Sequence, residues 1–279
     1  MKKDLKENLK VRPECEIIRK EFSNDDDMYY SDFQFITNSQ LGLLQDPRRY
    51  FHYRNIVENN LERNVSPAMV FGDAFHTSIL EPHKFEEKFI VEPNINKRTN
   101  AGKEEYQKWL DDNIGMTSLK VKDYDCVMNM RNKLLSDSYF KELLSGGTAE
   151  YVDVWEEQGV NCKGKYDYIT MDKIIDIKTT SNTCEKDKFI DTAEKYGYFR
   201  QAAFYLDGAW SHNEKAPREF YFIVIEKTPP YLFNVFIVGE DSYYKGRTEY
   251  KKRIKNYKDY IIGDSEGNKK LWEAKSEHI

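Results

Sequence analysis

The run from Ile174 to Lys178 places two chemically active side chains in an otherwise apolar segment with the pattern of a β-strand. Side chains alternate between the faces of a strand, so Asp176 and Lys178 share one face and Ile177 lies on the opposite, apolar face. A carboxylate and an ammonium in so apolar a strand need a partner or a function. Taken alone, this Asp-x-Lys pair is better explained as a same-face ion pair than as a catalytic motif.

A second carboxylate, Asp167, lies in the preceding predicted strand. If the two strands pair through a turn at Met171-Asp172, Asp167 comes to lie beside Asp176. Two such carboxylates raise each other's pKa unless a cation lies between them. Their hard oxygen atoms suit Mg²⁺ or Mn²⁺, which also bind water and phosphate oxygens. Lys178 would then orient or deprotonate a water that attacks phosphorus, or stabilise the developing charge, as hydrolysis of a phosphodiester requires.

Two residue pairs at i, i+4 spacing each share a helical face. Gln201 and Tyr205 would hydrogen-bond a phosphate or the metal-site residues, or else only flank a buried face. The apolar stripe beside them, expected to face the core, consists of Phe199, Ala203, Leu206 and Trp210. His76 is a candidate metal ligand or phosphate contact, with a structural histidine as the alternative. Gly72 costs about 1 kcal/mol against alanine inside a helix, which predicts that another backbone approaches closely there.

The elements that must position these residues follow from capping residues, turns and periodicity. Helices are predicted over 37–55 with an interruption near Pro47, from Ser66-Pro67 to about Leu80, over 101–113 and over 118–144. Strands at 149–156, 162–170 and 173–178 follow a change of pattern at Gly146-Gly147. Helices from about Glu185 and over 199–210, strands at 219–227 and 231–239, and a helix over about 241–262 complete the order. Residues 1–36 are expected to be extended.

This order of elements predicts a mixed α/β (α+β) fold, with a central mixed sheet flanked by helices and an N-terminal helical region. The chain has 279 residues, and its formal net charge of −5 is weak evidence against a nucleic-acid partner. Four scattered cysteines form no close CxxC pair, which argues against a zinc or cluster site. No apolar run approaches the roughly 20 residues of a membrane helix, and the charged N-terminus lacks the apolar stretch of a signal peptide. A cytoplasmic protein with no membrane partner is expected.

Four motifs occur in one order along the chain: G-x-x-x-H, then D, then D-I-K, then Q-x-x-x-Y. In this order the chain resembles the PD-(D/E)XK nuclease superfamily, its RecB-like branch and, within that branch, RecE-type exodeoxyribonuclease VIII proteins of phage origin. The resemblance runs from about Gly72 to Tyr205, extends loosely to EKTPPY at 226–231, and is most specific in CKGKYDYITMDKIIDIKTTSNT. Tyr166 stands where the superfamily has proline, and Asp176 where many relatives have glutamate. The cysteines do not follow the iron–sulfur members.

The resemblance implies that Asp167 and Asp176 are metal ligands, that the main-chain carbonyl of Ile177 is a further ligand, and that Lys178 is the catalytic lysine. The cofactor would be Mg²⁺ or Mn²⁺.

It also implies roles for residues outside these two strands. His76 would be the helical histidine of the RecB branch, at or next to the metal, and Gln201 and Tyr205 would support the site and contact DNA. Glu150 is expected to supply another acidic ligand, with Glu156 as its competitor.

As a whole, the resemblance implies one nuclease domain over 1–279 with a restriction-endonuclease-like core. Its parts would be a mainly helical segment 1–148 carrying the GxxxH motif, a catalytic core 149–240, and a C-terminal helix and tail 241–279. The expected function is metal-dependent exonucleolytic hydrolysis of double-stranded DNA from its ends, in phage-type recombination or repair. A ring-shaped homo-oligomer and a single-strand annealing recombinase as partner are implied by family alone. The alternatives are a catalytically inactive DNA-binding module of the same fold and a structure-specific endonuclease.

Overall fold

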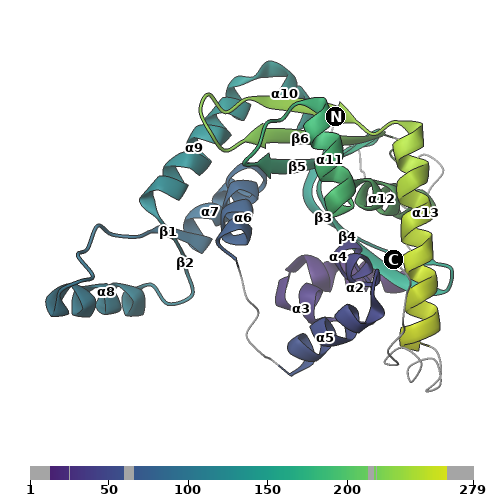
Figure 1. The fold of residues 1–279 in the computed structure, drawn as a ribbon, viewed down its shortest axis with the longest axis horizontal. Helices are drawn as coiled ribbons and strands as arrows, with labels where there is room; N and C mark the ends of the chain where they lie inside the picture. Colours follow the sequence, from purple (N-terminus) through teal and green to yellow (C-terminus); the bar gives the residue numbers. More distant parts are fainter. Residues whose placement is uncertain (1–12, 25, 60–65, 213–216, 218, 263–279) are drawn as a thin grey trace, which may run out of the picture.

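A five-stranded mixed sheet forms the centre of the computed structural model, which describes residues 13–24, 26–59, 66–212, 217 and 219–262 (Figure 1). The strand order is β3-β4-β5-β6-β7, with bounds Thr148–Glu157, Val160–Ile169, Lys173–Thr180, Glu219–Glu226 and Phe233–Ile237. Strands β5 and β6 pair in parallel, and the other neighbours pair antiparallel. The predicted central mixed sheet, with its five strands close to their predicted places, is confirmed.

The turns that join the first three strands follow from their sequences. Gln158 and Gly159, between β3 and β4, both have positive φ, 53° and 76°. Two residues in this conformation make the hairpin turn whose twist matches that of the paired strands. Between β4 and β5, the hydroxyl of Thr170 accepts a hydrogen bond from the backbone N–H of Lys173 at 3.1 Å. Local sequence therefore sets the connections of the strands that carry the candidate catalytic residues.

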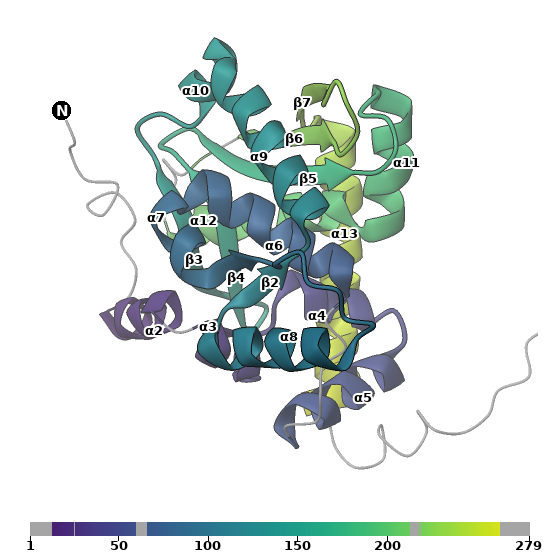
Figure 2. The same ribbon diagram turned by 90° about the vertical axis from the view of Figure 1, so that its left-hand side faces the viewer.

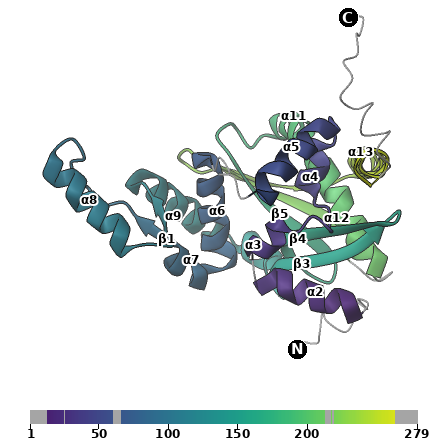
Figure 3. The ribbon, with the colours of Figure 1, turned by 90° about the horizontal axis from the view of Figure 1, so that it is seen from below.

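Helices cover both faces of the sheet, and alternation along the strands divides the apolar side chains between two cores (Figure 3). Helices α6 (Pro67–Leu80) and α9 (Val121–Ser136) lie on one side, and α12 (Tyr198–His212) and α13 (Glu240–Tyr257) on the other. The core beneath α6 and α9 receives Ile175, Ile177, Ile223 and Ile225. The core beneath α12 receives Ile174, Phe220, Phe222 and Val224. Asp176 and Lys178 alternate in step with Ile174 and therefore face α12.

Most predicted helices are present with small changes of bounds. Helices α4 (Asn38–Leu43) and α5 (Pro47–Glu58) form the interrupted helix predicted over 37–55, and Thr37 makes a capping box at α4. Helices α8 (Asn100–Asp112) and α11 (Lys186–Tyr196) lie where they were predicted, and α13 continues into a short π-helix over Lys258–Ile262. The helix predicted over 118–144 is two helices, because Asp137 follows α9 and caps α10 (Ser138–Leu143) with its side chain.

The prediction that residues 1–36 are extended is wrong for the part of this segment that the structure describes. Helices α2 (Pro13–Asn24) and α3 (Asp26–Ser31) form there, and they bury Phe22 and Tyr29 against Val152 and Val154 of β3. The remaining residues of that prediction, 1–12 and 25, lie outside the described residues.

Three short elements were missed because each is too short for its periodicity to be recognised. They are α7 (Pro82–Lys88) and the parallel strands β1 (Phe89–Val91) and β2 (Thr117–Leu119). The strands flank α8, which stands away from the sheet in Figures 1 and 3 and faces the viewer in Figure 2. In the part of the chain that the structure describes, no helix has the length and apolar character needed to cross a membrane.

The apolar stripe predicted for α12 is confirmed except at its end. Phe199, Ala203 and Leu206 are buried, whereas Trp210 is 37% exposed. Its indole N–H donates to the carbonyl of Pro217 at 2.5 Å, so the helix end lies at the surface, where a polar partner is available.

Contact between α12 and α13 depends on Gly246. A Cβ atom at this position would lie 1.9 Å from the carbonyl oxygen of Phe199, and a backbone atom cannot move aside as a flexible side chain would. We expect Gly246→Ala to force the helices apart and to lower the free energy of unfolding by about 3 kcal/mol, as overpacking does. The melting temperature should then fall by roughly 9 °C. Unchanged thermal unfolding of this variant would contradict the close contact.

Candidate metal centre and catalytic site

The site lies where β4 and β5 separate. Their ladder consists of two residue pairs next to the turn, Tyr168↔Ile175 and Ile169↔Ile174. Continued by one step, this register would set Asp167 opposite Asp176. Instead, the carboxylate Oδ2 of Asp167 accepts a hydrogen bond from the backbone N–H of Ile177 at 2.7 Å. A side-chain oxygen thus replaces the backbone carbonyl of the ladder.

Two further segments of the chain pack against β4 where it separates from β5. Ile36 pairs with Cys162 in a parallel bridge, on the edge of β4 opposite β3. From α12, the ring of Tyr205 packs so closely on Gly164 that a Cβ there would lie 2.8 Å from it. Tyr205 is 8% exposed. Its position in the predicted Q-x-x-x-Y motif therefore has a packing function: the ring lies against β4 at Gly164, and Gly164 makes room for it.

A buried network of hydrogen bonds and ring contacts lies next to Tyr205. The hydroxyl of Tyr166, at the position where the superfamily has proline, donates to Asp153 Oδ2 at 2.8 Å. Asp153, 1% exposed, also lies 3.0 Å from Nε2 of His212. The rings of Tyr166 and Tyr205 are 4.8 Å apart. Sequence reasoning missed Asp153 and His212, because residues so far apart in the chain carry no local pattern that links them.

Asp176 is the most deeply buried of the predicted metal-ligand carboxylates, at 2% exposure. Its Oδ1 accepts a hydrogen bond from Gln201 Nε2 at 2.7 Å. Its Oδ2 is paired with Lys178 Nζ at 2.7 Å. Burial, helped by the charge of Asp167, raises the pKa of Asp176 to about 6 despite Lys178. A buried carboxylate oxygen of this kind favours an added cation.

A second group of possible ligands meets Asp167 from two other elements. Possible ligand atoms of His76 on α6, Glu150 on β3 and Asp167 on β4 all lie within 4.8 Å of one another. Nδ1 of His76 is 3.3 Å from Asp167 Oδ2. Burial opposes protonation of His76, but the charge of Asp167, its hydrogen bond to the imidazole and the charge of Asp176 together outweigh burial and raise the pKa of His76 to about 9. Metal binding by this imidazole would require its neutral form.

The structure brings Glu150 and not Glu156 to this cluster. Glu150 has a positive φ of 48°, a backbone conformation that costs a non-glycine residue energy and is found most often at functional sites. Burial, with the charge of Asp167, raises the pKa of Glu150 to about 7. Glu156 is exposed near the far end of β3, where it pairs with Asn161. The metal-ligand role of Glu150 stays a prediction.

The prediction that another backbone approaches Gly72 closely is wrong. A Cβ atom at this position would have no described atom within 4 Å, outside its own neighbours. We therefore expect Gly72→Ala to raise the free energy of unfolding by about 1 kcal/mol through helix propensity alone, measured by urea denaturation. This substitution also serves as the control for Gly246→Ala, since both place the same methyl group in a helix. A destabilised Gly72→Ala protein would show that something occupies the space.

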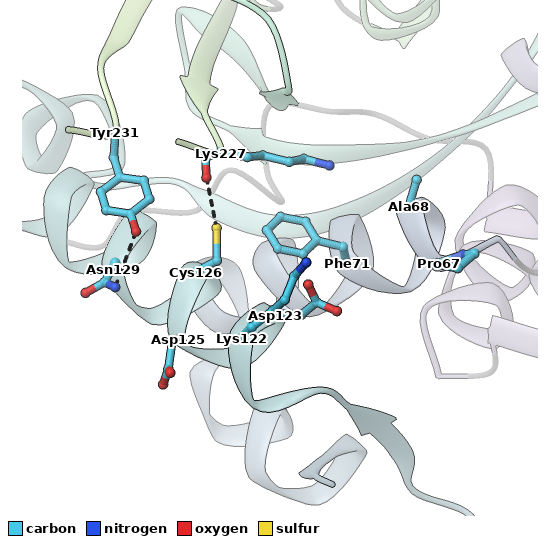
Figure 4. A pocket seen from close by; sticks show the side chains of 10 residues that line it. All are labelled: Pro67, Ala68, Phe71, Lys122, Asp123, Asp125, Cys126, Asn129, Lys227 and Tyr231. Carbon is cyan, nitrogen blue, oxygen red and sulfur yellow. Dashed lines mark hydrogen bonds between the residues drawn. The ribbon is translucent and has the colours of Figure 1, made fainter. Parts of the chain in front are cut away.

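Two cavities lie near these elements, and their charges differ. A cavity of about 600 Å³ between α6 and α9 is lined by Lys122, Lys227, Asp123 and Asp125, whose formal charges cancel (Figure 4). A smaller cavity of about 420 Å³ contains Lys178 itself, together with Gln201 and Tyr205. The smaller cavity adjoins the candidate catalytic residues and is the better place for an anionic substrate.

The comparisons with known proteins agree with this fold. Residues 49–269 match the family described as "PDDEXK-like domain of unknown function (DUF3799)". The chain is similar to a crystal structure from Eubacterium rectale described as a "Putative exonuclease", with 12% identity and a TM-score of 0.57 over 89% of this chain and 85% of that chain. The crystal structure of SSO0001, with 16% identity, covers 70% of this chain and 87% of its own, but its TM-score of 0.30 supports no argument. A search of curated proteins found no match.

Proposed function

The chain belongs to the family of PDDEXK-like domains, and from this premise we propose that it is a metal-dependent DNA nuclease. The observation that carries the proposal is the buried Asp176, whose Oδ2 is paired with Lys178 Nζ at 2.7 Å. A structural ion pair would not need a second carboxylate, Asp167, and an imidazole next to it. The arrangement supports hydrolysis of a phosphodiester rather than a purely structural role.

The donor set fits a divalent metal. Asp167 and Asp176 would hold it through carboxylate oxygens, with His76, Glu150 and the main-chain carbonyl of Ile177 as the further predicted ligands. Oxygen-rich sets of this kind favour Mg²⁺ or Mn²⁺ over softer metals. Bound there, the metal would polarise a phosphate oxygen and make water a better nucleophile.

The protein side chains have separate tasks in this proposal. Lys178, through Nζ, would orient or deprotonate the attacking water, or stabilise negative charge that develops on the phosphate. Gln201 would hold Asp176 in one orientation through its 2.7 Å hydrogen bond. Tyr205 would support β4 next to the site through the close packing of its ring on Gly164.

We further propose that the enzyme is an exonuclease of the RecE type that degrades double-stranded DNA from its ends. The order of the four sequence motifs supports this finer assignment, and so does the description of the similar Eubacterium rectale protein as a "Putative exonuclease". A single-strand annealing recombinase as partner and a ring-shaped homo-oligomer belong to the same proposal.

Digestion of end-labelled linear duplex and of closed circular DNA, with Mg²⁺ and with EDTA, tests the function. Nucleotide release from the linear substrate alone, abolished by EDTA, would support the exonuclease. Nicking of the closed circle would instead support the structure-specific endonuclease. Binding without any cleavage under Mg²⁺ or Mn²⁺ would overturn the nuclease proposal in favour of an inactive DNA-binding module.

A further inference from the structure

The cavity of about 420 Å³ beside Lys178 is lined partly by a tyrosine pair that the catalytic proposal does not use. Its lining includes Tyr196 and Tyr198, on either side of the junction between α11 and α12. Two cationic side chains, Lys178 and Arg200, line the cavity, and their carboxylate partners, Asp176 and Glu249, lie outside its lining. Its charge and its aromatic rings together suit a nucleotide, which joins a flat base to a phosphate.

The junction that presents the tyrosines is closely packed at Gly197. Gly197 ends α11 with a left-handed φ of 71°, which glycine adopts without strain. A Cβ at Gly197 would lie 2.5 Å from the guanidinium of Arg200. That guanidinium is buried and is held by Glu249 at 2.6 Å and by Asn38 at 3.0 Å. The ring positions on either side of Gly197 are therefore set by the fold.

The two tyrosines have different surroundings. The ring of Tyr198 packs against Phe222 at 5.8 Å and Phe189 at 6.3 Å, and Lys178 Nζ lies 4.7 Å from its centre. Tyr198 is thus a packed residue that supports the lysine. Tyr196 stacks on Tyr198, with centres 6.0 Å apart and planes at 27°. Tyr196 is 58% exposed, so much of its ring remains open beside the cavity.

We propose that Tyr196 is a stacking platform for an unpaired base of the DNA strand that is cut, with a neighbouring phosphate directed toward Lys178. The inference rests on the proposed nuclease function and specifies its substrate at the site. Every base has an aromatic face, so such a platform binds without regard to sequence. A base that lies on Tyr196 has left the stack of the duplex, so the strand is single at the site. A duplex end must therefore fray before it is cut.

Equilibrium binding in EDTA tests the platform without cleavage. The probe is a short fluorescein-labelled single strand of DNA, measured by fluorescence anisotropy with the full chain. We expect Tyr196→Ala to weaken binding about tenfold, the order of one base–aromatic stack, and Tyr196→Trp to bind as wild type does. Tyr139→Ala is the matched control, because Tyr139 is 48% exposed on α10 and lines neither described cavity. Wild-type affinity in Tyr196→Ala would overturn the proposal.

Strands that carry 2-aminopurine near one end locate the base. Its fluorescence should be quenched in the wild-type complex at one position, remain quenched with Tyr196→Trp, and recover with Tyr196→Ala. Equal quenching by wild type and Tyr196→Ala would place the base elsewhere and reject the platform.

Cleavage assays separate failure of this inference from failure of the nuclease proposal. With Mg²⁺, we expect wild type to cut duplexes with mismatched, frayed ends at lower KM than fully paired ones, and Tyr196→Ala to raise KM for both substrates. Cutting by Tyr196→Ala at the wild-type KM for both substrates would reject the platform and leave the nuclease intact. A wild-type protein that neither cuts nor binds DNA would reject both.

Discussion

Replacing Lys178 by methionine is expected to slow DNA cleavage by about 10³-fold, within the range of a lost general acid–base or charge-stabilising group. Methionine keeps most of the aliphatic chain and removes the ammonium, which lies 2.7 Å from Asp176 Oδ2 and 4.7 Å from the centre of the Tyr198 ring. Arginine should not restore the rate, because its planar guanidinium presents its charge differently. The measurement is single-turnover release of labelled nucleotide from linear duplex in Mg²⁺.

Lys173→Met is the matched control for this substitution. Lys173 and Lys178 lie on the same strand, and the side chains of both are 20% exposed. Lys173 pairs with Asp172 at the turn and has no contact with Asp176 or Asp167 that would involve it in catalysis. A similar loss of rate in both variants would mean that the strand, rather than the Lys178 ammonium, had been damaged. Binding of DNA in EDTA and the melting temperature report on that damage directly.

Asp167→Asn is expected to abolish stabilisation of the protein by divalent metal. A ligand present at about 100 times its dissociation constant stabilises the folded state by about 2.7 kcal/mol. For a chain of this size, that stabilisation corresponds to a rise of roughly 5–10 °C in melting temperature. We expect such a rise when Mn²⁺ replaces EDTA with the wild-type protein and none with Asp167→Asn. Each variant is compared with itself, so loss of the His76 contact does not affect the result.

The same measurement distinguishes Glu150 from Glu156 as the further acidic ligand of the metal. Glu150→Gln should lose much of the rise in melting temperature, since Glu150 lies within 4.8 Å of the ligand atoms of His76 and Asp167. Glu156→Gln should keep all of it, because Glu156 is exposed near the other end of the same strand. Full stabilisation of Asp167→Asn by Mn²⁺ would remove Asp167 from the metal centre.

The parts of the site that sequence predicted are those with a local cause. Strand alternation placed Asp176 and Lys178 on one face and Ile177 in the opposite core, because the side-chain period of a strand is two. The register between β4 and β5 follows from their short turn, which pairs Tyr168 with Ile175 and Ile169 with Ile174. Helical spacing likewise put Gln201 and Tyr205 on one side of α12, where Gln201 reaches Asp176.

Long-range packing accounts for what the sequence could not show. The choice of Glu150 over Glu156 depends on which end of β3 faces α6, and no local pattern encodes that. The contact between the Tyr205 ring and Gly164 joins a helix to a strand, so neither residue alone reveals it. Gly72 was misjudged for the same reason, because a helical glycine looks alike whether or not a neighbour approaches.

By itself, then, the sequence determined which residue types line one face of the central strands, where the turns and caps lie, and in which order the four motifs occur along the chain. Tertiary structure alone decided the separation of β4 from β5, the meeting of His76 with Asp167, and the open ring of Tyr196 beside Lys178. Turns, caps and alternation depend on a few neighbouring residues. A site that gathers helices and strands from distant segments exists only once their apolar faces have been buried together.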